Sequence, residues 1–134
     1  MKQEKEVVLK KRRRSKVHPG QTIRAESGCG DLYVTINWDK VGPIEVFASL
    51  GKAGGCSVAH LEALTRAITL GIKYNIPLKE YTKHLKGIKC PTPTHSEGAE
   101  VPSCLHAIGR VLEDYGNEKP PDYETFYKTK ETKV

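Results

Sequence analysis

The chain has 134 residues, of which 37% are hydrophobic and 28% charged, and this length favours a single domain with one modest core. No segment approaches the roughly 18 consecutive apolar residues of a membrane-spanning helix. The N-terminal sequence MKQEKEVVLKKRRR has no apolar stretch typical of a secretory signal. We therefore expect a soluble, cytoplasmic protein with reduced thiols and no membrane contact.

The formal net charge of +6 comes from the first sixteen residues, which hold eight Lys and Arg against two Glu. The basic run spans residues 10–14, with Lys16 beyond it. Such a run binds polyanions, nucleic acid among them, or serves as a localisation signal. It is also typical of a solvated terminus without fixed structure, because like charges repel. We expect a basic, disordered arm at 1–16, a domain at 17–116 and a polar tail at 117–134.

Strands are predicted first along the domain. Residues 32–36 and 44–50 alternate apolar and polar side chains, with the period of two that is typical of half-buried strands. The short link at 39–43 contains Gly42, so the two segments form an antiparallel hairpin. Residues 21–27 are expected to form an earlier strand that turns into this hairpin at 28–30.

Helices follow the strands. Apolar residues spaced by three or four from Val58 to Ile72 predict one helix, with Ser57 as its N-cap and Asn75 as its stop. A second helix is predicted from Pro77 to Gly87, and a third from Ser103. We expect the third to bury six side chains, namely Cys104, Ala107, Ile108, Val111, Leu112 and Tyr115. Strands followed by helices indicate an α+β fold.

The tail from residue 117 to 134 opens with two prolines and is otherwise polar. We expect it to be extended. Its aromatic residues Tyr123, Phe126 and Tyr127 could pack on the domain or form a motif for a partner.

The four cysteines, Cys29, Cys56, Cys90 and Cys104, carry the chemistry of this sequence. None belongs to a CxxC pair, yet each lies at a junction between predicted elements rather than within a strand. Glycines flank Cys29 and precede Cys56, while Cys56 and Cys104 lie at predicted helix N-termini, where the helix dipole lowers a thiol pKa. Four such thiolates can bind Zn²⁺ tetrahedrally and join sheet, helices and loop through the metal.

Other interpretations of the cysteines remain open. Unligated cysteines are often simply buried, two of them could form a redox pair, and four could hold an iron–sulfur cluster. His106 lies two residues after Cys104 and could join a mixed ligand set, although we expect it to face solvent beside the N-cap.

Four segments resemble the TSCPD domain: DLYVTIN (31–37), EVFASLGKAGGC (45–56), LKGIKCP (85–91) and VPSCLHAIG (101–109). This domain lies near the C-terminus of adenosylcobalamin-dependent (class II) ribonucleotide reductases and also forms small stand-alone proteins. The resemblance covers about residues 20–112 and assigns all four cysteines to the family's cysteine positions. One departure stands in the naming motif, where Leu105-His106 replaces the usual Pro-Asp.

The resemblance implies a metal-binding or redox-related accessory module in deoxynucleotide synthesis. Our first hypothesis is a zinc-stapled domain that docks on a class II ribonucleotide reductase subunit or a related protein. The reductase's catalytic barrel, cobalamin site and radical-bearing cysteines cannot fit in these residues, so we expect no catalysis by the chain alone. The family context is ribonucleoside-diphosphate reductase. Two alternatives remain: a small nucleic-acid-associated protein that binds through residues 10–16 and uses zinc only as scaffold, and a thiol–redox partner.

Overall fold

A three-stranded antiparallel sheet forms the centre of the protein, whose computed structural model describes residues 9–51 and 56–132. Strands β1 (Gly20–Ser27), β2 (Gly30–Trp38) and β3 (Pro43–Leu50) are paired in sequence order. The alternating side chains of β2 divide as the sequence predicts: Leu32, Val34 and Ile36 are fully buried, while Tyr33 is exposed. The sheet therefore has one face in the core and one outer face.

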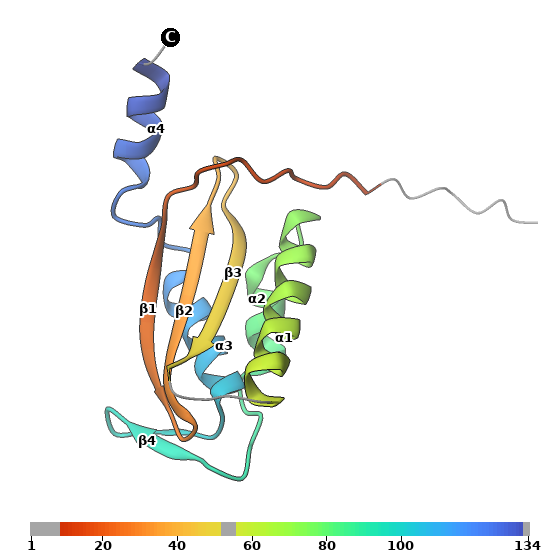
Figure 1. Ribbon diagram of the computed structural model, residues 1–134, viewed down its shortest axis with the longest axis vertical. Helices are drawn as coiled ribbons and strands as arrows, with labels where there is room; N and C mark the ends of the chain where they lie inside the picture. The colour runs from red at the N-terminus through yellow and green to blue at the C-terminus, as the bar shows by residue number, and fades with distance from the viewer. Residues whose placement is uncertain (1–8, 52–55, 133–134) are drawn as a thin grey trace, which may run out of the picture.

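Helices cover only the inner face of the sheet (Figure 1). Helix α1 (Cys56–Lys73) packs against β3, helix α3 (Cys104–Tyr115) packs against β1 and β2, and helix α2 (Leu78–Leu85) packs against α3. Their apolar faces bury residues of the predicted spacing, including Leu61, Ile68, Ile72, Ile108 and Leu112. This arrangement confirms the α+β fold class.

Helix α1 covers the free edge of β3 as well as its inner face. The Thr69 hydroxyl accepts a hydrogen bond from the backbone N–H of Val46 at 3.0 Å and donates one to the carbonyl of Val46 at 3.1 Å. A side chain thus occupies the backbone groups that another strand would otherwise pair with. The helix stops at the predicted place, because Asn75 adopts a left-handed φ of 68° and the N–H of Ile76 bonds the carbonyl of Gly71 at 3.0 Å.

A second, two-stranded sheet lies where the sequence predicted only a loop. Strands β4 (Thr94–Ser96) and β5 (Ala99–Val101) pair across a turn at Glu97 and Gly98, both of which have positive φ. The strands have three residues each, so they are too short to show the alternation that predicts a strand.

The C-terminal tail is helical rather than extended as predicted. Helix α4 (Tyr123–Thr132), whose side chains are described through Lys128, follows a turn at Pro120. The Tyr123 ring is buried edge-on against Trp38 at 6.0 Å, and the Tyr127 hydroxyl donates to the carbonyl of Trp38 at 3.3 Å. These aromatic residues therefore pack on the chain's own core.

Two arginines of the basic run are bound to the domain. The Arg12 guanidinium pairs with Asp39, and its backbone N–H bonds the carbonyl of Lys73 at 2.8 Å. Arg14 pairs with Glu45 at 2.8 Å, and Glu45 is only 2% exposed. Burial on its own raises the pKa of Glu45, but the hydrogen bonds from Arg14 and Asn37 outweigh it and keep that pKa below its usual value.

The disorder expected for residues 1–16 stays a prediction for residues 1–8, which lie outside the described part of the chain. Among the described residues, no helix is both long and apolar enough to cross a membrane.

Candidate metal centre

All four cysteines lie toward one end of the molecule. The sequence predicted that each lies at a junction between elements, but not where these junctions lie in space. The turn between β1 and β2, the beginnings of α1 and α3, and the loop before β4 meet at this end (Figure 1). Cys29 lies in the turn, Cys90 in the loop, and Cys56 and Cys104 are the first residues of their helices.

Thr92 joins two of the thiols. Its hydroxyl lies 3.4 Å from Sγ of Cys29 and 3.6 Å from Sγ of Cys90, so the two sulfurs are at most 7.0 Å apart, the sum of these distances. Gly28 makes the approach possible, because a Cβ at this position would lie 1.6 Å from the carbonyl oxygen of Thr92. No motif in the sequence pointed to Thr92.

The N-terminus of α3 holds the segment that carries Cys90. Ser103 is 1% exposed. Its hydroxyl accepts a hydrogen bond from the backbone N–H of His106 at 3.0 Å, as an N-cap does, and donates one to the carbonyl of Ile88 at 2.5 Å. The backbone N–H of Cys90 bonds the carbonyl of Pro102 at 3.0 Å. Cys90 and Cys104 are therefore kept at a fixed relative position by backbone contacts.

The Cys104 thiol contradicts one prediction. Burial raises its pKa, and the neighbouring Cys29 and Cys90 raise it further, while the N–H groups at the start of the helix lower it by less. The expectation that the helix N-terminus would give Cys104 a depressed pKa is therefore wrong, since desolvation disfavours the charged form. A half-buried thiol with a raised pKa is a poor nucleophile in the absence of a cation.

Cys29 and Cys90 lie near enough to Cys104 to raise the pKa of its thiol. Cys56 is exposed at the start of α1, directly after residues 52–55, which lie outside the described part of the chain. The free thiols are the ligand type that Zn²⁺ prefers.

Their spacing is wider than a bound metal requires. Zn–S bonds of about 2.3 Å bring the sulfurs of a tetrahedral site to about 3.8 Å from one another. Within residues 9–51 and 56–132, no group of three or more His, Cys, Asp or Glu side chains stands close enough to hold a metal ion. The donor set fits zinc in its chemistry, and the thiols must move closer together to bind it.

His106 occupies the position where the resembled motif usually has Asp. Its side chain was predicted to face solvent, and in the structure it also makes a hydrogen bond to the backbone. Its Nδ1 accepts a hydrogen bond from the backbone N–H of Gly87 at 2.8 Å. Burial lowers the pKa of His106, and the cations Arg110 and Lys86 lower it further. The imidazole thus acts as a neutral acceptor that fixes the loop leading to Cys90.

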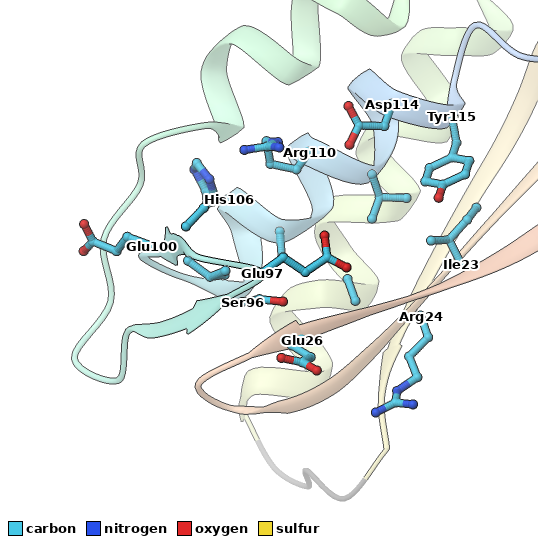
Figure 2. Close-up of a pocket in the computed structure, with 15 residues that line it drawn as sticks. Ile23, Arg24, Glu26, Ser96, Glu97, Glu100, His106, Arg110, Asp114 and Tyr115 are labelled. Carbon is cyan, nitrogen blue, oxygen red and sulfur yellow. The ribbon is translucent and has the colours of Figure 1, made fainter.

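A groove lies beside this region rather than at the thiols. It has a volume of about 420 Å³ and is formed by β1, the β4–β5 hairpin and α3 (Figure 2). Four carboxylates line it, and no ion pair joins them to another described side chain: Glu26, Glu97, Glu100 and Asp114. No sequence motif pointed to this acidic groove, because β1 is distant in the sequence from the hairpin and α3.

Comparison with known families gives one match, to the TSCPD domain, over residues 5–116. Neither the curated proteins nor the solved structures contain a match to the chain. The matched region includes all four cysteines, the sheet and helices α1 to α3. The chain therefore belongs to the TSCPD domain family, which is associated with ribonucleotide reductases.

Proposed function

We propose that this chain is a zinc-binding accessory module that acts together with a ribonucleotide reductase and is not catalytic on its own. The observation that carries the proposal is that the Thr92 hydroxyl contacts the thiols of both Cys29 and Cys90, while Cys104 and Cys56 begin helices α3 and α1 at the same end of the domain. Separate segments deliver these thiols to one end of the domain. A purely structural role for buried cysteines would not require such convergence.

In this proposal all four thiols bind one Zn²⁺, which supplies charge neutralisation and a crosslink rather than a reaction. A cation beside Cys104 offsets the burial that keeps its thiol protonated. The Thr92 hydroxyl, close to two of the sulfurs, is placed to donate its one hydrogen bond to either of them once they are thiolates. Zinc is proposed rather than an iron–sulfur cluster because closed structural sites of four thiolates are typical of zinc.

Metal binding is tested by titrating chelator-treated protein with Zn²⁺ in competition with a chromophoric chelator. We expect one Zn²⁺ per chain and a higher melting temperature, with each of the four Cys→Ser variants binding at least about tenfold more weakly. Ser49→Ala, an exposed change on β3, is the control. An unchanged melt and no stoichiometric zinc would remove the metal from the proposal.

The partner is tested separately by affinity capture from the native host with zinc-loaded, full-length chain as bait. We expect a ribonucleotide reductase subunit in the eluate, and its loss when the bait carries Cys90→Ser. Recovery of no reductase by a bait that has bound zinc would refute the association while leaving the metal site intact.

A further inference from the structure

Charge is distributed unequally between the two edges of the sheet. The β1 edge borders the groove, whose lining holds four carboxylates against Arg24 and Arg110 (Figure 2). At the β3 edge, acidic side chains are neutralised: Glu45 pairs with Arg14 and Glu62 with Arg66. The β3 side is therefore the side that suits an anionic partner.

A shallow cavity of about 230 Å³ lies at this edge between β3 and α1. Its apolar surface includes Phe47 and Leu70, both 51% exposed. Three cationic residues, Lys11, Arg66 and Lys73, line the same cavity, and no carboxylate does. An exposed ring surrounded by cations matches a ligand that has both a flat apolar part and negative charge.

A second aromatic residue extends this surface along the sheet. Tyr33 is 37% exposed on the outer face of β2, opposite Ser49, while Phe47 lies opposite Thr35. The two rings are thus diagonal neighbours on adjacent strands, a relation in which Cα atoms are about 7–8 Å apart. This spacing suits two successive unstacked bases of a single strand.

The basic run borders the same surface. It crosses the upper end of the sheet toward the end of α1 (Figure 1), and the bond from Arg12 to Lys73 fixes it there. Arg12 and Arg14 are engaged in ion pairs, but the remaining basic side chains of the run are exposed and no hydrogen bond or ion pair joins them to another described residue: Lys10, Lys11, Arg13 and Lys16.

We propose that this surface, formed by Tyr33, Phe47 and the cations that line the cavity beside Phe47, with the basic run at its border, binds a single strand of nucleic acid. Bases stack on the two rings, and phosphates contact the cations. Stacking does not depend on base identity, because every base has a π-face, so binding is largely independent of sequence. Duplex binds more weakly, since its paired bases are unavailable to the rings.

The test is fluorescence anisotropy with a labelled deoxythymidine 15-mer and the zinc-loaded, full-length protein. We expect Phe47→Ala to weaken binding about tenfold and Tyr33→Ala to weaken it by a similar factor. Phe47→Trp retains binding and Phe47→Leu does not, which separates stacking from apolar contact. Tyr115→Ala is the matched control, since Tyr115 is 38% exposed on α3 beside the acidic groove.

The phosphate contacts are tested by salt dependence. Lys10→Gln with Lys11→Gln is expected to reduce the slope of log affinity against log salt by about 1.4, since each phosphate contact of a single strand contributes about 0.7. Lys79→Gln with Lys89→Gln is the matched control away from the surface. Binding that survives loss of both rings, or equal affinity for duplex, would show polyelectrolyte attraction only and overturn the proposal, as would no binding at low salt.

Discussion

Replacement of Ser103 by alanine tests the connection between α3 and the loop that carries Cys90. The variant loses the N-cap, which costs about 1 kcal/mol, and leaves the carbonyl of Ile88 without its donor, which costs about 1 kcal/mol more. The expected loss is therefore about 2 kcal/mol of unfolding free energy. For a domain of this size it corresponds to a drop of about 8 °C in melting temperature.

The same substitution is expected to weaken zinc binding about tenfold or more, because Cys90 and Cys104 lose their fixed relative position. Urea denaturation of the metal-free protein gives the stability, and chelator competition gives the affinity. Ser103→Gly separates the two contributions, since glycine is a tolerated N-cap and the variant loses mainly the bond to Ile88. A melting temperature within about 1 °C of the parent, or an unchanged zinc affinity, would refute the reasoning.

Three further predictions follow from individual contacts. Gly28→Ala places a Cβ 1.6 Å from the carbonyl oxygen of Thr92, so the turn must shift away from the loop. We expect the free energy of unfolding, measured by urea denaturation, to fall by about 1–3 kcal/mol and zinc binding to weaken. Gly51→Ala, where the Cβ makes only ordinary contacts, serves as the control. The pKa of His106 is lowered by burial and then by Arg110 and Lys86, so the unfolded chain binds the proton more readily than the folded one. The free energy of unfolding should therefore fall as pH drops below about 6.5 and level off below the folded pKa. Melting temperatures measured over a pH series should vary less in His106→Asn, and an unchanged series would count against this role. Arg14→Gln removes the ion-pair partner of the buried Glu45 and should lower the free energy of unfolding, measured by urea denaturation, by about 1–2 kcal/mol. Arg13→Gln should change it by no more than about 0.5 kcal/mol. Equal effects of the two substitutions would contradict the pairing.

Much of the fold follows from local pattern. The buried residues of β2 alternate over a long segment, and those of α1 recur at helical spacing, so both elements were predicted with their correct faces. The β4–β5 hairpin and α4 were missed for opposite reasons. The hairpin is too short to show a period, and α4 is a mostly polar segment whose helical state depends on Tyr123 packing against Trp38.

The candidate site was predictable in its residues but not in its geometry. Cysteines at junctions pointed to a shared centre, and the third helix was predicted to start at Ser103, which the structure shows to be its N-cap. The role of Thr92 could not be inferred, because it depends on the approach of Gly28 from a distant turn. The pKa of Cys104 was predicted in the wrong direction, because the sequence shows the helix N-terminus but not the burial that outweighs it.

In the proposed metal centre, the four thiols of Cys29, Cys56, Cys90 and Cys104 bind a single zinc ion. X-ray absorption spectroscopy of protein loaded with one equivalent of Zn²⁺ tests it most directly. We predict four sulfur ligands at about 2.3 Å and no oxygen or nitrogen in the coordination sphere. A spectrum dominated by oxygen or nitrogen ligands at about 2.0–2.1 Å would contradict the claim.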